Sequence, residues 1–205
     1  MLADKIGVFG GSFNPVHLGH LVLAQDALES FELDSVLFIP CGNPSHKDLA
    51  TFASHEHRLA MLQRVIELEF RFEVSDVEVT REGTSYMIDT LEELQADFPG
   101  EELVFIVGSD TLTDLFCWHR IDELLHRHRI IAPVRPGYEV DRLKAMDFQL
   151  EEGWKEKLLE NVISGHQIEI SSSEIRMRVA EGMSIRYLVP SEVEMYIYEH
   201  GLYKG

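Results

Sequence analysis

The feature that most constrains the fold is the alternation of short apolar runs with longer stretches of helical period. Runs rich in β-branched residues and bounded by Gly or Pro predict buried strands at residues 6–9, 36–39, 103–107 and 130–134. Stretches of helical period predict helices at residues 18–31, 55–70 and 85–98. Strands and helices in this order favour a parallel sheet covered on both faces. We therefore expect an α/β fold, a doubly wound and mainly parallel sheet with helices on both faces.

Several segments depart from this regular alternation. Residues 72–79 predict a less regular strand near a sheet edge, and residues 40–53 predict a polar loop that is long enough to act as a lid. Residues 136–166 are expected to form a variable excursion, with one helix near residues 154–161. A short strand is expected at residues 168–170.

Capping boxes mark the expected starts of two C-terminal helices. Ser171-x-x-Glu174 and Ser191-x-x-Glu194 both combine a serine with a glutamate three residues later. The chain shows no internal repeat and no linker-like composition. We therefore expect a single domain over residues 1–205, with a C-terminal helical portion from about residue 171.

The charge balance limits the classes of partner. With 18 Lys and Arg against 36 Asp and Glu, the formal net charge is −18, which argues against general binding of a nucleic-acid polymer. A small anionic ligand needs only a local group of donors. Cys41 and Cys117 form no metal-binding or disulfide pattern. No targeting segment or membrane-length apolar run is visible, so we expect a cytoplasmic protein without a membrane partner.

A glycine-rich stretch follows the first predicted strand and leads into the first predicted helix. In a doubly wound sheet, ligands bind beyond the carboxyl ends of the strands, so this is the expected place for a site. The small residues Gly10, Gly11 and Ser12 let backbone N–H groups approach a phosphate, and Gly19 keeps the helix start unobstructed. The stretch predicts a phosphate-binding turn.

Two histidines lie at the end of the same stretch. His17 and His20 are three residues apart, so near a helix N-terminus they can face the same way and hold the oxygens of a transferring phosphoryl group. The stretch is neither a Rossmann GxGxxG nor a P-loop. A half zinc site is the alternative interpretation of His-x-x-His, but no third ligand lies at a suitable spacing, so we expect no protein-built metal site.

Residues 10–20 resemble the (T/H)xGH signature of the nucleotidylyltransferase superfamily. Further blocks resemble motifs of the bacterial nicotinate-nucleotide adenylyltransferase family over nearly the whole chain: residues 39–47 (IPxxxPPHK), 83–91 (GxSYTIDTL), 105–110 with Trp118 (FIxGxD and a tryptophan), and 170–178 (ISSTxIRxR). The chain departs from the family at Asn14, where many members have Asp, which puts a metal contact there in doubt. Ser45 and Met87 replace a Pro and a Thr of the family motifs.

The resemblance implies a Rossmann-like nucleotidyltransferase fold and adenylyl transfer from ATP to nicotinate mononucleotide in NAD biosynthesis. It implies catalytic roles in phosphate binding for four residues: His17, His20, Lys47 and Arg176. It implies ATP binding by Gly10, Gly11, Ser12, Phe13, Gly19, Gly108, Asp110, Ser171, Ser172 and Ser173. Mg²⁺ is expected to accompany ATP, with few ligands from the protein.

The resemblance also implies a mononucleotide pocket formed by His46, Thr84, Ser85, Tyr86 and Trp118. Structural interpretations remain open for several of these residues: Trp118 as ordinary core, Ser85 as a helix cap, and Asp110 as an N-cap. Phosphopantetheine adenylyltransferase, which shares the first motif, is the nearest rival, and a non-catalytic nucleotide sensor is a rival from another class. The expected partners are ATP and the mononucleotide, and the sequence leaves open a homo-oligomer.

Overall fold

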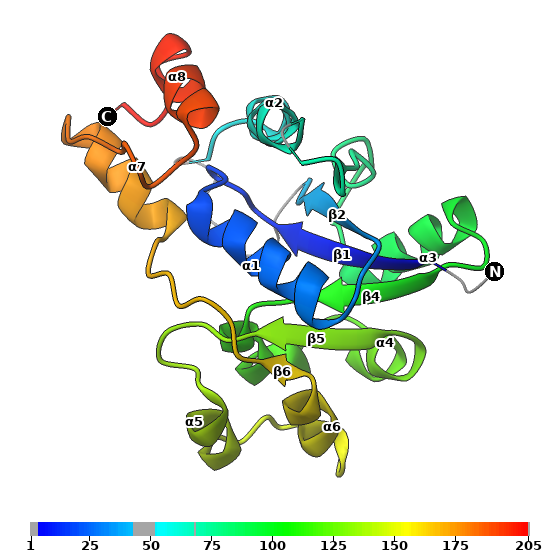
Figure 1. The fold of residues 1–205 in the computed structure, drawn as a ribbon. Helices are drawn as coiled ribbons and strands as arrows, with labels where there is room; N and C mark the ends of the chain where they lie inside the picture. The colour runs from blue at the N-terminus through cyan, green and yellow to red at the C-terminus, as the bar shows by residue number, and fades with distance from the viewer. Residues whose placement is uncertain (1–3, 43–51, 68, 205) are drawn as a thin grey trace. The chain divides into compact units, whose positions relative to one another are not determined.

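Six β-strands form one sheet in the order β3-β2-β1-β4-β5-β6 (Figure 1). The computed structural model describes residues 4–42, 52–67 and 69–204. The strands are β1 (Lys5–Gly11), β2 (Ser35–Pro40), β3 (Phe72–Val74), β4 (Glu102–Ile106), β5 (Arg129–Pro133) and β6 (Val162–Ile163). The helices are α1 (Leu18–Ser30), α2 (His55–Ile66), α3 (Met87–Asp97), α4 (Ile121–Arg127), α5 (Val140–Ala145), α6 (Trp154–Glu160), α7 (Ser172–Ala180) and α8 (Ser191–Glu199).

The strand order reverses between β1 and β4. β1 pairs with β4 in parallel from Lys5 opposite Glu102 to Phe9 opposite Ile106, and β4–β5 and β5–β6 are also parallel. Because parallel crossovers are right-handed, connections that run in opposite directions along a sheet place their helices on opposite faces. The predicted doubly wound α/β fold is therefore confirmed.

Contacts divide the chain into two compact units. The first unit comprises Met1–Phe9, Val22–Val36 and Tyr86–Glu169, and its buried side chains include Phe105, Ile106 and Ile131 from β4 and β5. The second unit comprises Gly10–Leu21, Leu37–Ser85 and Ile170–Gly205, and buries Phe38, Met61 and Ile197. The single domain expected over residues 1–205 stays a prediction. No helix in the described part of the chain is long and apolar enough to cross a membrane.

The structure differs from the sequence predictions at several places. Helices α4 and α5 were not predicted, and α2 ends at Ile66 rather than at residue 70. Residues 168–170 form no strand; β6 lies earlier, at Val162–Ile163. β3 ends at Val74, because the chain turns over residues 77–79. α3 begins at Met87 rather than near residue 85.

The predicted capping box at Ser191 is also wrong. The extended backbone continues to Pro190, which becomes the N-cap, so Ser191 is the first helical residue and its hydroxyl donates to Glu192. The box at Ser171 is confirmed on the serine side, because Ser171 Oγ accepts from the backbone N–H of Glu174 at 3.2 Å.

Candidate active site

His17 and His20 stack on one another at the start of α1, in the second unit. Their ring centroids are 3.6 Å apart and their planes differ by 25°. His17 is buried, whereas His20 is partly exposed. The backbone N–H of His17 donates to His20 Nδ1 at 3.2 Å, which places the proton of neutral His20 on Nε2. The structure thus brings the predicted histidine pair together, with His20 Nε2 as a hydrogen-bond donor.

Neighbouring residues fix the positions of these rings. A Cβ on Gly19 would lie 3.1 Å from His17 Cε1 and Nδ1, which is tighter than most Cβ contacts, so a residue without a side chain suits this turn. Phe13 is fully buried and its ring contacts the edge of His20 at a centroid distance of 5.0 Å. Phe13 therefore supports His20 from the core, and its predicted ATP contact stays a prediction.

Arg176 and the serines of α7 lie close to the same turn. Arg176 Nη1 donates to the backbone oxygen of Asn14 at 2.8 Å, and Ser172 Oγ donates to the backbone oxygen of Pro15 at 2.9 Å. Ser171 is the N-cap of α7, and its hydroxyl lies 3.1 Å from that of Ser173. The start of α7 is thus attached to the loop that precedes the histidines.

The side chain of Asn14 is occupied by contacts within the second unit. Its Oδ1 accepts from the backbone N–H of Ala53 at 3.0 Å and from the hydroxyl of Tyr203 at 2.8 Å, and the residue is fully buried. Burial raises the pKa of Tyr203, so its hydroxyl stays protonated and continues to donate. The side chain of Asn14 therefore anchors the loop to Ala53 and Tyr203.

Arg58 on α2 is a buried cation that is not among the site residues predicted from the sequence. Its guanidinium donates to the backbone oxygens of Ser12 at 2.9 Å, Ala53 at 3.2 Å and Gly42 at 3.4 Å. Burial lowers its pKa from the usual arginine value. The signal was present in the sequence, because Arg58 lies three residues before Met61, on the apolar face of α2.

Arg58 also lines a cavity of about 380 Å³ in the second unit. His55, Glu78, Arg81 and Gly83 line the same cavity, so its wall carries charges of both signs. Gly83 begins the block whose next residues, Thr84 and Ser85, the family resemblance assigned to the mononucleotide. Within the described residues, the buried Ser85 Oγ has no hydrogen-bond partner.

We expect Arg58→Met to lower the free energy of unfolding by about 2–4 kcal/mol, because carbonyl oxygens that now accept from the guanidinium would lose their donor while buried. Urea unfolding followed by circular dichroism measures the change. Arg64→Met on the same helix is the matched control, since Arg64 is exposed and lies over the Tyr196 ring. Equal losses in the two variants would contradict a structural role specific to Arg58.

Tyr86 and Trp118 belong to the first unit. Tyr86 is the N-cap of α3 and makes no side-chain capping bond, so the alternative that Ser85 caps this helix is wrong. The Tyr86 ring lies 4.2 Å, centroid to centroid, from the ring of His119, the residue after Trp118. Trp118 is half-buried, with its ring 5.7 Å from that of Phe105. The structure therefore brings the segment that carries Trp118 against the start of α3.

Gly108 and Asp110 follow β4 in the same unit. A Cβ on Gly108 would lie 2.3 Å from Asp110 Oδ1 and 2.8 Å from Arg135 Nε, so only glycine fits without a shift. Gly108 is the N-cap of the 3₁₀ helix η2 (Ser109–Thr113), which corrects the alternative that Asp110 is the cap. Asp110 Oδ1 lies 3.7 Å from Arg135 Nε, so the two side chains form an ion pair beside the turn.

Two predicted site residues, His46 and Lys47, lie outside the described residues. Over residues 4–42, 52–67 and 69–204, no group of three or more His, Cys, Asp or Glu could hold a metal ion. The remaining predicted residues, Gly10, Gly11 and Ser12, lie at the end of β1 and in the residue after it.

Comparison with known proteins identifies the family of this chain. Residues 8–178 match the family model described as cytidylyltransferase-like. The chain belongs to the cytidylyltransferase-like family. Among its relatives, proteins named probable nicotinate-nucleotide adenylyltransferase occur in Trichlorobacter lovleyi, at 41% identity, and in Lachnoclostridium phytofermentans, at 39% identity. The alignments cover 98% and 97% of this chain, and 99% and 98% of the relatives.

A solved structure of the same fold is the Plasmodium falciparum nicotinic acid mononucleotide adenylyltransferase complexed with NaAD. Its TM-score is 0.76 at 20% identity, with 98% of this chain and 97% of that chain covered. The likeness shows the Rossmann-like nucleotidyltransferase fold of this cytidylyltransferase-like chain. The resemblance to the nicotinate-nucleotide adenylyltransferases, first seen in the sequence motifs, is confirmed by the relatives.

Proposed function

We propose that the protein transfers the adenylyl group of ATP to nicotinate mononucleotide, which gives nicotinate adenine dinucleotide and pyrophosphate, in the cytoplasm. The observation that carries the proposal is the stacked pair His17–His20 at the start of α1, directly after β1. Relatives of this chain that are 39–41% identical over nearly its full length are named for this activity.

The chemistry needs no general base. A phosphate oxygen of the mononucleotide, already ionised at pH 7, forms a bond to the α-phosphorus of ATP, and the bond from that phosphorus to the bridging oxygen of pyrophosphate breaks. Catalysis then depends on positioning and on neutralising charge at the transferring group. We assign the donor at the α-phosphate to His20 Nε2, because the Nδ1 atom of the same ring accepts from the His17 backbone.

Arg176 and α7 supply the second set of phosphate contacts in this proposal. Arg176 has donors beyond the one that it gives to Asn14, and a guanidinium can hold two phosphate oxygens at once. The first turn of α7, from Ser172, adds backbone N–H groups and the positive end of the helix dipole. Lys47, with His46, is proposed to reach the phosphates from the loop at residues 40–53, and Gly108 and Asp110 to contact ATP.

Mg²⁺ enters the proposal as part of the substrate. The described residues do not fit a resident metal site, since they contain no suitable cluster and the Asn14 side chain is already bonded within the protein. The ion would neutralise charge on the phosphates of ATP. No step that we assign to the chain depends on a metal ligand from the protein.

The test is pyrophosphate release from Mg-ATP with each candidate acceptor. We expect release with nicotinate mononucleotide and none with 4′-phosphopantetheine. Release with phosphopantetheine alone would transfer the assignment to the rival family. Nucleotide binding without release from any acceptor would favour the sensor alternative, and both outcomes contradict the proposal.

A further inference from the structure

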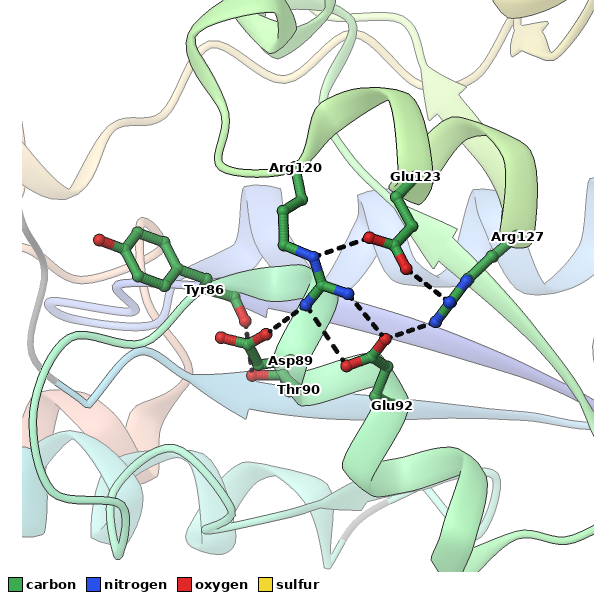
Figure 2. A network of polar contacts seen from close by, with 7 residues as sticks. All are labelled: Tyr86, Asp89, Thr90, Glu92, Arg120, Glu123 and Arg127. Carbon is green, nitrogen blue, oxygen red and sulfur yellow. Dashed lines mark hydrogen bonds and ion pairs between the residues drawn. The ribbon is translucent and has the colours of Figure 1, made fainter.

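A network of five charged side chains joins α3 to the segment after Trp118 (Figure 2). Arg120 is at its centre. Its Nη1 lies 2.9 Å from Asp89 Oδ1, and its Nη2 lies 3.1 Å from Glu92 Oε1. Its Nε lies 2.7 Å from Glu123 Oε2. Asp89 and Glu92 belong to α3, whereas Glu123 belongs to α4. One guanidinium therefore holds the first turns of α3 and the start of α4 together.

Arg127 completes the network from the last turn of α4. It pairs with Glu92 and with Glu123, so each of these glutamates is shared by two arginines. The network thus holds Glu92 and Glu123 in place even without Arg120. Asp89 lies in the first turn of α3. Among the ion pairs of the described residues, Asp89 pairs only with Arg120.

The backbone at Arg120 is in an unusual conformation. It has φ 53° and ψ 40°, the left-handed region, and serves as the N-cap of α4 without a capping side chain. A residue other than glycine is uncommon there, and such a conformation costs on the order of 1 kcal/mol. Arg120 is therefore a position where backbone strain coincides with a set of charged contacts that span two elements.

Stability alone does not explain this arrangement. The side chain of Arg120 is 34% exposed and its partners Asp89 and Glu92 are 42% and 38% exposed. Ion pairs with this much exposure contribute little to folding, because solvent screens them. What the contacts do determine is geometry, since a planar guanidinium with three carboxylate partners fixes their relative positions.

Two residues that the family resemblance assigns to the mononucleotide, Tyr86 and Trp118, lie beside the contacts of Arg120. Tyr86 is the N-cap of α3, three residues before Asp89, and Trp118 lies two residues before Arg120. His119, between Trp118 and Arg120, contacts the Tyr86 ring. A shift of the segment at 118–120 relative to α3 would thus change the distance between Trp118 and Tyr86.

We propose that Arg120 is a positioning residue for mononucleotide recognition: it holds the Trp118 segment against the start of α3 and so sets the distance between Trp118 and Tyr86. Arg120 does not touch the reacting atoms. This inference rests on the proposed function for the identity of the substrate. The contacts of Arg120 with Asp89, Glu92 and Glu123, here called the Arg120 clamp, belong to the first unit, and their effect can be measured without substrate.

The test replaces Arg120 with glycine, which removes the guanidinium and accepts the left-handed backbone. We expect KM for nicotinate mononucleotide to rise about 10-fold, with KM for ATP and kcat changed less than about 3-fold, because a misplaced pocket mainly loses substrate binding. Arg127→Ala is the matched control, since it leaves all three carboxylate partners of Arg120. It should keep both KM values within about 2-fold of wild type.

A second readout follows Trp118 without any substrate. In a Trp154→Phe background, Trp118 is the remaining tryptophan of the chain. We expect Arg120→Gly to lower its fluorescence anisotropy and to raise its quenching by iodide, whereas Arg127→Ala should change neither. Comparison with Arg120→Ala separates backbone strain from the lost contacts: the two variants should behave alike if the side chain positions the segment.

The outcomes distinguish this inference from the function on which it rests. If the wild-type protein releases no pyrophosphate with any acceptor, the function fails, and the anisotropy of Trp118 still tests the clamp. If Arg120→Gly raises both KM values equally, or only lowers the melting temperature, Arg120 has a merely structural role and the inference is overturned. Unchanged anisotropy in an otherwise active variant overturns it as well.

Discussion

Replacing His20 with alanine should lower kcat by roughly 10²–10³-fold, because a donor aimed at the transferring phosphate acts mainly in the transition state. Folding should change little, since the His20 ring is partly exposed while Phe13 beneath it stays buried. The measurement is steady-state pyrophosphate release at saturating substrates, with the melting temperature as a check on folding.

Two further substitutions at His20 test which ring atom matters. The amide nitrogen of glutamine lies near the position of Nε2, whereas that of asparagine lies near Nδ1. We expect His20→Gln to keep more activity than His20→Asn, since Nδ1 is already used by the His17 backbone. His126→Ala, an exposed histidine on α4, is the control and should keep full activity. Greater activity in the asparagine variant would contradict the assignment to Nε2.

Nicotinate mononucleotide should be preferred over nicotinamide mononucleotide by at least about 10²-fold in kcat/KM. The two differ only in a carboxylate against a carboxamide. The start of α3 offers backbone N–H groups, and Tyr86 supplies no capping side chain to them. A carboxylate accepts from two such donors, whereas a carboxamide must leave one unpaired or turn its NH₂ toward it, at a cost of about 1–3 kcal/mol. The carboxamide also lacks the negative charge that strengthens the hydrogen bonds of the carboxylate, which adds to this cost.

The ratio of kcat/KM for the two mononucleotides, measured under identical conditions, checks this expectation. Trp118→Phe is a useful companion, because it keeps an aromatic ring and should weaken both substrates without abolishing the preference. A ratio near one would contradict the assignment of the mononucleotide pocket to Tyr86 and Trp118. It would not contradict the assignment of adenylyl transfer.

The sequence was most informative where local signals and buried runs agree. The runs at 6–9 and 103–107 became neighbouring central strands, and the helix expected at 18–31 was found as α1. Here periodicity, flanking glycines and burial all favour the same structure. The glycine turn and its histidines follow β1, as the sequence predicted, so the sequence alone was enough to place these residues in the fold.

The elements that were missed lack a local signal. β6 has two residues, too few to show a period, whereas the alternation of Ile168 and Ile170 suggested a strand that the sheet does not contain. The role of Arg120 also lacks a local signal in the sequence. Its partners Asp89 and Glu92 are 31 and 28 residues away, and only the fold brings them together. Arg58 did leave a signal, a charge on an apolar helix face, which indicates a buried cation with backbone acceptors.

The contacts of Asn14 have a consequence for the order in which the protein can be assembled during synthesis. This residue bonds to partners 39, 162 and 189 positions further along the chain, Ala53, Arg176 and Tyr203. Long-range contacts of this kind form late, because the intervening chain must first be ordered. A growing polypeptide can therefore form α1 early, but β1 lacks its partner β4 until residues 102–106 have been made, and the turn before His17 lacks its last contact until Tyr203 has been added. Binding of nucleotide should therefore appear only after Tyr203 has been synthesised.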